Sequence, residues 1–193
     1  MKSVLAIILL YGFSSWAGPV AVSTDSTVGV VVKGGIATVS VPADARKALI
    51  QWRPEFLVFD LKDYGESVKS LVKEVNAEGT PMAFVADFNS DGVKDIVLLG
   101  SDLYQQYAVA LVNVAGTWKV IEIQSWKIPN IRKIMTKNEN KEKETGIPLY
   151  VIPAQEEHAK KLGKKTGIQV ERFMGSAAVY EITDGKAIQV KLP

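Results

Sequence analysis

The chain has 193 residues, with 23 Lys and Arg against 21 Asp and Glu, and it contains no cysteine. A nearly balanced charge gives no general attraction to nucleic acid or to an anionic membrane surface. The lack of thiols excludes disulfides, thiolate metal sites and a cysteine nucleophile. We therefore expect no nucleic-acid partner and a fold that is stabilised mainly by packing.

The amino terminus has the three-part layout of a secretory signal. The basic residue Lys2 precedes the apolar run Val4 to Leu10, and Ser15-Trp16-Ala17 places small residues at the two positions that a signal peptidase reads. A membrane-spanning helix needs roughly 20 consecutive apolar residues, whereas Gly12 interrupts this run. We predict that residues 1–17 are cleaved, that no transmembrane segment remains, and that the protein is periplasmic or extracellular.

Residues 18–135 are predicted to form an α+β domain, with a mostly antiparallel sheet and one or two packed helices. Two β-branched runs separated by Gly34-Gly35 predict a hairpin, because two glycines can take the positive φ angles of a tight turn. Apolar residues near helical spacing predict two helices, of which the second should lie on the sheet. The expected strands are 28–32, 36–41, 56–61, 82–86, 96–99, 107–114 and 118–123, and the expected helices are 45–52 and 66–76.

A charged and polar linker is predicted at residues 136–146, which have no apolar periodicity. Residues 147–193 are predicted to form a small β-α-β-β lobe. Its expected elements are a strand at 148–152, a helix at 154–162 ended by Gly163, strands at 168–173 and 177–182, and a turn at Asp184-Gly185 leading into 187–192. So short a segment cannot build a comfortable core of its own, and we expect it to pack on the first domain or to form a small satellite.

One segment, residues 87–95, carries the chemistry of a metal site. Oxygen-bearing side chains stand at its first, third, fifth and ninth positions, and the glycine at its sixth position allows the chain to turn sharply. Calcium takes six to eight hard oxygen ligands in a tolerant geometry. Three crowded carboxylates repel one another, and a divalent cation relieves that repulsion. We predict a Ca²⁺ site formed by the side chains of Asp87, Asn89, Asp91 and Asp95 and the carbonyl of Val93.

An EF-hand would place a glutamate at the twelfth position of this loop, where the chain has Leu98. The stretch from Val85 to Gly100 instead resembles the calcium loop of FG-GAP and VCBS-type repeats, known from integrin-like β-propellers. The resemblance implies that the loop joins two strands and that its first, third, fifth and ninth positions hold calcium. The position of Ser90 is often glycine in such repeats. A propeller is not expected, because it needs four to eight blades and this chain shows one copy of the motif.

Other interpretations of these residues stay open. Asp and Asn also cap tight turns through hydrogen bonds to their own backbone, without a metal. Asp60 and Asp63 could form a carboxylate pair for glycoside hydrolysis, although such pairs are common on surfaces. The aromatic side chains of Trp52, Trp118 and Trp126 could line a glycan or peptide surface, although large aromatics are more often core. The only histidine, His158, is expected to be exposed on a helix.

We therefore expect a non-enzymatic, exported calcium-binding module in which the ion is structural. Its further role would be to bind an unknown protein or glycan partner. A secreted carboxylate-dependent hydrolase is the rival interpretation, and it requires a concave pocket with two converging acids outside the loop. A structural envelope protein is the third interpretation, and it requires a flat exposed apolar or aromatic patch.

Overall fold

The computed structural model describes residues 20–22, 27–76, 80–127, 147–163 and 166–191. The predicted signal peptide and the predicted linker at 136–146 lie outside these residues. The described chain forms twelve strands in three sheets, with helices α1 (Ala43–Trp52), α2 (Glu66–Val75) and α4 (Glu156–Leu162) and a short 3-10 helix, η1 (Leu61–Asp63). The predicted α+β class with mostly antiparallel sheet is confirmed.

The N-terminal sheet has the order β1-β3-β2, formed by β1 (Val20–Val22), β2 (Gly29–Lys33) and β3 (Ile36–Val41). The predicted hairpin is confirmed, since Lys33 pairs with Ile36 and both intervening glycines have positive φ angles of 59° and 78°. Strand β1 is a finding that the sequence did not predict. It has three residues and pairs in parallel with β3, whereas every other strand pair in the described chain is antiparallel.

The central sheet has five strands: β4 (Leu57–Val58), β5 (Ala83–Ala86), β6 (Asp95–Ser101), β7 (Gln105–Val114) and β8 (Thr117–Lys127). Strands β4 and β5 pair with different parts of β6, and the sheet continues through β7 to β8. The two middle strands β6 and β7 are the most buried, as their long apolar runs require. This sheet therefore holds both ends of the acidic loop.

The predicted strand at 56–61 is wrong beyond Val58. The carboxylate of Asp60 accepts a hydrogen bond from the Lys62 amide at 3.1 Å, and the carboxylate of Asp63 accepts one from the Asp60 amide at 3.2 Å. This reciprocal pair is a capping box, which starts the 3-10 turn η1 and ends the extended backbone.

The C-terminal sheet has the order β12-β11-β10-β9. It is formed by β9 (Leu149–Pro153), β10 (Ile168–Arg172), β11 (Ala177–Thr183) and β12 (Lys186–Val190), with α4 between β9 and β10. Helix α4 ends at Gly163, whose φ of 65° suits glycine. The segment thus has the predicted β-α-β-β order and one further strand, β12, after the turn at Asp184.

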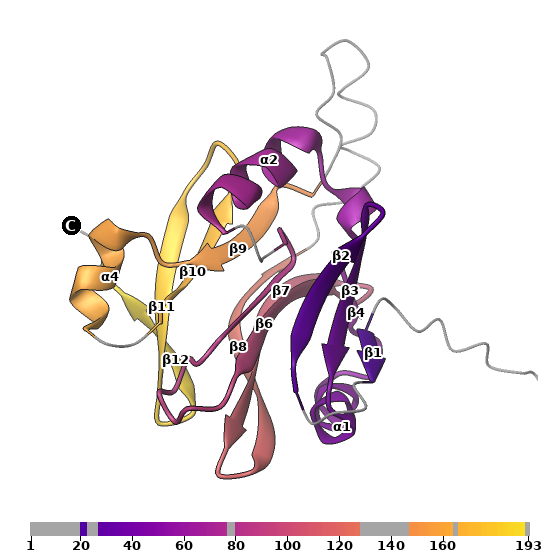
Figure 1. Cartoon of the computed structure of the whole chain (residues 1–193), viewed down its shortest axis with the longest axis vertical. Helices are drawn as coiled ribbons and strands as arrows, with labels where there is room; N and C mark the ends of the chain where they lie inside the picture. Colours follow the sequence, from indigo (N-terminus) through magenta and orange to yellow (C-terminus); the bar gives the residue numbers. More distant parts are fainter. Residues whose placement is uncertain (1–19, 23–26, 77–79, 128–146, 164–165, 192–193) are drawn as a thin grey trace, which may run out of the picture.

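The three sheets share one hydrophobic core, and Figure 1 shows the central sheet between the N-terminal and C-terminal sheets. Helix α2 buries Val68 and Val72 and contacts β9, so the helix predicted to lie on a sheet does so. The amide of Val151 donates a hydrogen bond to the carbonyl of Pro81 at 3.0 Å, which joins β9 to the residues before β5. None of the described helices has the length and apolar character needed to cross a membrane.

Candidate metal loop

The acidic loop joins β5 to β6. Ala86 pairs with Asp95 across these two strands, so the chain must reverse within the residues between them. Ser90 and Gly92 take left-handed backbone conformations, with φ angles of 60° and 85°. A Cβ atom at Gly92 would meet nothing within 4 Å, so the requirement for glycine there comes from the backbone conformation and not from crowding.

Two of the predicted ligand oxygens converge on a single backbone amide. The Oδ1 atoms of Asp87 and Asn89 accept hydrogen bonds from the amide of Asp91, at 3.1 and 3.3 Å. The Oδ2 atom of Asp87 accepts another from the amide of Gly92 at 2.9 Å. The Nδ2 group of Asn89 donates to the carbonyl of Asn113 at 2.8 Å, which orients the oxygen of that side chain toward the loop.

The carboxylate of Asp91 also closes the loop on itself. Its Oδ1 atom accepts a hydrogen bond from the amide of Val93 at 2.8 Å, and its Oδ2 atom accepts one from the Nδ2 group of Asn89 at 2.9 Å. The side chain is exposed, and so are Gly92 and Val93. Solvent and ions therefore have access to this side of the loop.

Asp95 differs from the other loop acids because it is fully buried, with 0% of its surface exposed. Its carboxylate accepts hydrogen bonds at 2.9 Å from the amide of Phe88 in the loop and from the amide of Asn113 on β7. Burial is the main cause that raises the pKa of Asp95 to about 6; the nearby charges of Asp91 and Asp87 contribute to this rise, and the two hydrogen bonds oppose it. Asp95 thus ties the loop to the sheet at an electrostatic cost.

The ligand chemistry of the loop fits calcium, because every predicted ligand atom is a hard oxygen. The arrangement is that of a hydrogen-bonded turn. Among the described residues, no group of three or more acidic, histidine or cysteine side chains is already placed to hold a metal ion. An ion at the loop would therefore require Asn89 and Asp91 to give up the hydrogen bond between their side chains. No described lysine or arginine forms an ion pair with a loop carboxylate.

The other residues singled out from the sequence contribute to local structure or to packing. Asp60 and Asp63 use their carboxylates in the capping box of η1. The three tryptophans 52, 118 and 126 are half-buried and pack against the core. His158 is half-buried on α4, which corrects the expectation that it is exposed.

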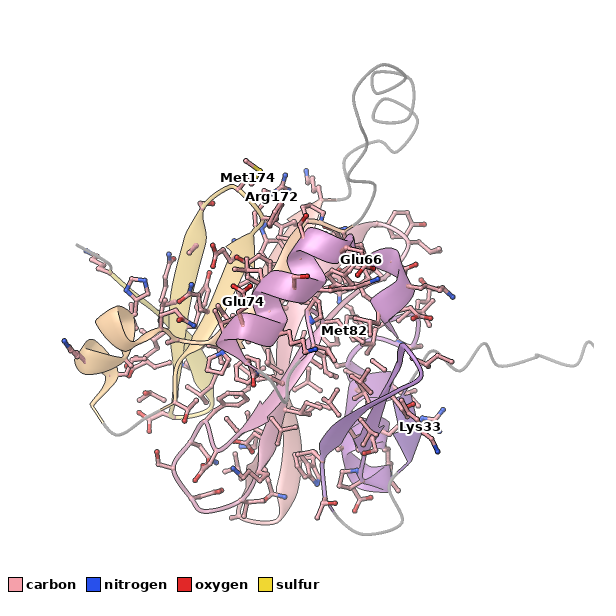
Figure 2. The ribbon with its side chains drawn as sticks, turned by 45° about the horizontal axis from the view of Figure 1, so that its top comes forward. Lys33, Glu66, Glu74, Met82, Arg172 and Met174 are labelled. Atoms are coloured by element: carbon pink, nitrogen blue, oxygen red, sulfur yellow. The ribbon has the colours of Figure 1, made fainter. Side chains whose placement is uncertain are left out.

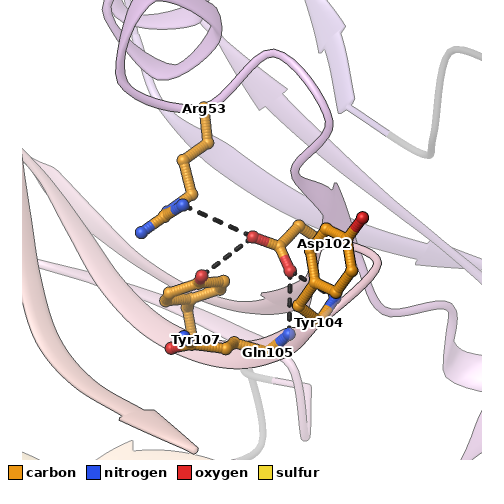
Figure 3. Close-up of polar contacts among 5 residues, drawn as sticks. All are labelled: Arg53, Asp102, Tyr104, Gln105 and Tyr107. Carbon is orange, nitrogen blue, oxygen red and sulfur yellow. Dashed lines mark hydrogen bonds and ion pairs between the residues drawn. The ribbon is translucent and has the colours of Figure 1, made fainter. Parts of the chain in front are cut away.

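Sequence reasoning missed a second acidic turn, which follows β6 at Asp102 (Figure 3). The carboxylate of Asp102 accepts hydrogen bonds from the amides of Tyr104 and Gln105, at 2.7 and 2.8 Å, and from the hydroxyl of Tyr107 at 2.8 Å. The guanidinium of Arg53 lies 3.4 Å away. Burial by itself raises the pKa of Asp102, but the hydrogen bonds and the charge of Arg53 outweigh burial and hold the pKa below its usual range.

Arg53 is itself held by aromatic rings. Its guanidinium carbon lies 4.5 Å from the ring centre of Tyr107 and 5.1 Å from that of Trp52. Such cation–π contacts favour a fixed cation. The turn itself could have been predicted, because an Asp commonly bonds the amide two residues later. The pairing with Arg53 could not, because the two residues are 49 positions apart and lie on different elements.

Comparison with models of known families, with curated proteins and with solved structures found no match for this chain. The resemblance of residues 85–100 to FG-GAP and VCBS-type loops therefore stays a prediction.

Proposed function

We propose that this protein is an exported, non-enzymatic calcium-binding module, in which the loop at 87–95 binds one Ca²⁺ ion with a structural role. One observation carries the proposal. A fully buried carboxylate, that of Asp95, lies beside the carboxylates of Asp87 and Asp91, and no cationic side chain of the described residues is paired to any of them. A divalent cation is the partner that this concentration of negative charge lacks.

The residues that would hold the ion are those expected from the sequence: Asp87, Asn89, Asp91, Asp95 and the carbonyl of Val93. The ion would supply positive charge at the strand connection, and no reaction step is assigned to it. Because Asp95 also bonds the amides of the loop and of β7, an ion bound to it would stabilise the attachment of the loop to the sheet. This supports a structural role.

The export part of the proposal rests on the features of residues 1–17. Calcium is plentiful outside the cytoplasm, so a site of modest affinity could stay filled there. Expression of the full chain in a bacterial host, followed by mass measurement of the purified product, tests this part. We expect a chain that begins at Gly18, and a product that keeps its first seventeen residues would refute cleavage.

Thermal unfolding tests the calcium site. A ligand that binds only the folded state at about one hundred times its Kd stabilises that state by about 2.7 kcal/mol. For a chain of this size, such a gain raises the Tm by roughly 5 to 10 °C. We expect calcium to raise the Tm by this amount relative to a chelator, and magnesium to raise it much less, because Mg²⁺ demands a stricter octahedral shell.

Two substitutions separate a site effect from a charge effect. Asp91→Ala should abolish the calcium-dependent rise in Tm. Asp44→Ala removes the same charge from an exposed position in the first turn of α1 and should keep the full rise. A calcium response that is absent in the unmodified protein, or that is equal in the two variants, would overturn the proposal.

A further inference from the structure

A second site lies in a cleft between β8 and one face of the C-terminal sheet. The cleft encloses about 310 Å³, part of it open to solvent. Gln124 and Trp126 line it from β8, and Leu149, Val170 and Arg172 line it from β9 and β10. Figure 2 shows Arg172 beside Met174, where β10 turns toward β11. Most of this volume is open to solvent, and the enclosed part, about 60 Å³, is below the range for drug-sized ligand pockets, so the cleft suits only a small ligand.

A β-bulge in β8 places two of these side chains in the cleft. Ala108 pairs with Gln124 and Val109 pairs with Glu122, so Ile123 has no residue opposite it on β7. Because residues that pair across a ladder share a face, the extra residue brings Gln124 and Trp126 to the face of Ile121. Strict alternation would have placed Ser125 and Lys127 there instead. Bulges commonly redirect side chains in this way next to binding sites.

The polar groups around the cleft are mainly hydrogen-bond donors. Within the described part of the chain, the guanidinium of Arg172 and the indole N–H of Trp126 form no ion pair or hydrogen bond. The hydroxyl of Ser176 lies at the exposed edge. The oxygen of the Gln124 side chain already accepts the hydroxyl of Tyr180 at 2.8 Å, which leaves its amide N–H groups to face a ligand. A ligand that complements these groups must supply acceptors.

The carboxylate that borders the cleft does not balance these donors. Glu171 also lines the cleft, between Val170 and Arg172 on β10, but its carboxylate is engaged in a separate group of hydrogen bonds. It accepts a hydrogen bond from the Nε2 group of Gln169 at 2.9 Å and another from the hydroxyl of Tyr150, whose pKa is raised by burial and by this acid. Gln169 and Glu171 alternate with Val170 and Arg172, so their side chains belong to the opposite face of the sheet.

The cleft is closed below by Leu149, Val170 and Ala178, but Leu149 and Val170 are only 2% and 3% exposed, so most of the surface that a ligand can reach is polar. Donors around a small polar cleft match a ligand with a negatively charged acceptor group and a small body. We propose that the cleft binds a small organic carboxylate, with the carboxylate held by Arg172 and its body packed beside Trp126. Arginine is suited to this role because its planar donors match the two oxygens of a carboxylate.

Hexanoate and hexanamide are matched probes, because they share an apolar body and differ in charge. Titration of each into the full protein, in the presence of a chelator, would be followed through the NMR signal of the Trp126 indole N–H, assigned with Trp126→Phe. We expect hexanoate to shift this signal in a saturable manner and hexanamide to leave it nearly unchanged. Equal shifts from both probes, or no saturable shift from hexanoate, would overturn the proposal. The chelator makes this outcome independent of the calcium site.

Two charge-matched variants locate the anion. Arg172→Gln should weaken hexanoate binding by about tenfold or more, the effect of losing a charge-assisted hydrogen bond. Lys33→Gln removes one positive charge from the tip of the β2–β3 hairpin, far from Arg172 in Figure 2, and should leave the affinity unchanged. Both side chains are exposed, so folding should be unaffected. Equal weakening in both variants would show that only the net charge matters and would exclude the site.

To separate a free acid from the end of a chain as the source of the carboxylate, the same titration would use a short peptide with an apolar last residue and its amidated form. A free acid as the ligand predicts that only hexanoate saturates the signal. A peptide carboxyl terminus predicts saturation by the acid peptide and none by the amide. Binding of the amidated peptide as tightly as the acid form would contradict recognition of a carboxylate.

Discussion

An acidic turn lies at each end of strand β6, and the pKa of the buried aspartate is shifted in opposite directions in the two turns. At one end, Asp102 has the guanidinium of Arg53 at 3.4 Å, and its pKa is lowered. At the other end, Asp95 has two more carboxylates nearby and no ion pair with a lysine or arginine in the described part of the chain, and its pKa is raised to about 6. Both carboxylates are buried and both accept backbone hydrogen bonds.

Burial raises the pKa of both carboxylates and is the largest influence on each. At Asp102, three hydrogen bonds and, to a smaller extent, the charge of Arg53 outweigh burial. At Asp95, two backbone hydrogen bonds do not outweigh it, and the neighbouring acids add to the rise. The turn at Asp102 is complete within the chain. The loop at 87–95 has the composition of a turn that is completed by an ion from solution, which is the basis of the proposed function.

The largest expected effect on stability comes from removing the carboxylate of Asp102, which is paired with Arg53. Asp102→Ala leaves the hydroxyl of Tyr107 and the charge of Arg53 without their partner, and it should lower the free energy of unfolding by about 3 kcal/mol. Urea denaturation measures this change. Tyr107→Phe removes only one of the hydrogen bonds and should cost about 1 kcal/mol. Equal losses in the two variants would show that the carboxylate is not the centre of the cluster.

The next effect concerns the pH dependence of the calcium-free protein. Because the pKa of Asp95 is raised in the folded state, that state binds more protons than the unfolded chain between about pH 4 and 6. The contribution of Asp95 to the free energy of unfolding should therefore fall, by roughly 2 to 3 kcal/mol, as the pH rises through this window.

Comparison with Asp95→Asn isolates this contribution, since other carboxylates titrate in the same range. The difference in free energy of unfolding between the unmodified protein and this variant should decrease from pH 4 to pH 7. A constant difference across this range would mean that the carboxylate is charged throughout, as at Asp102.

A smaller effect is the pH dependence of calcium binding, which arises because a proton and Ca²⁺ compete for the carboxylate of Asp95. At pH 5 the carboxylate of Asp95 is mostly protonated, and calcium must displace that proton, whereas at pH 7 it is already charged. We expect the affinity for calcium, measured by calorimetry, to be about tenfold lower at pH 5 than at pH 7. Calcium binding without pH dependence would show that Asp95 is not a ligand.

The smallest effect tests the backbone of the loop. Gly92→Ala places a Cβ at a φ of 85° and should cost about 1 kcal/mol of folding free energy. Gly185→Ala, at a φ of 71° in the turn between β11 and β12, should cost a similar amount, because neither position is crowded. Only Gly92→Ala should also weaken calcium binding. If both variants changed the calcium affinity equally, the assignment of the calcium site to this loop would be contradicted.

Local patterns in the sequence determined most of the elements of this protein. Periodic apolar residues predicted α2, and Gly34-Gly35 and Asp184-Gly185 predicted two hairpin turns, because spacing and turn chemistry act within a few residues. The same locality identified the loop at 87–95 and its oxygen set. It missed β1, which has three residues and exists through its pairing with β3. It also extended a strand past Val58, where a capping box ends the strand.

Only the tertiary structure determined which charged side chains of these elements are buried, paired or placed beside like charges. The sequence places Asp95 and Asp102 seven residues apart with no sign that one is paired with Arg53 and the other is surrounded by acids. It likewise gives no sign that a bulge at Ile123 turns Trp126 toward Arg172. Burial, ion pairing and strand register depend on residues far away in the chain, and those distances are fixed only when the sheets pack.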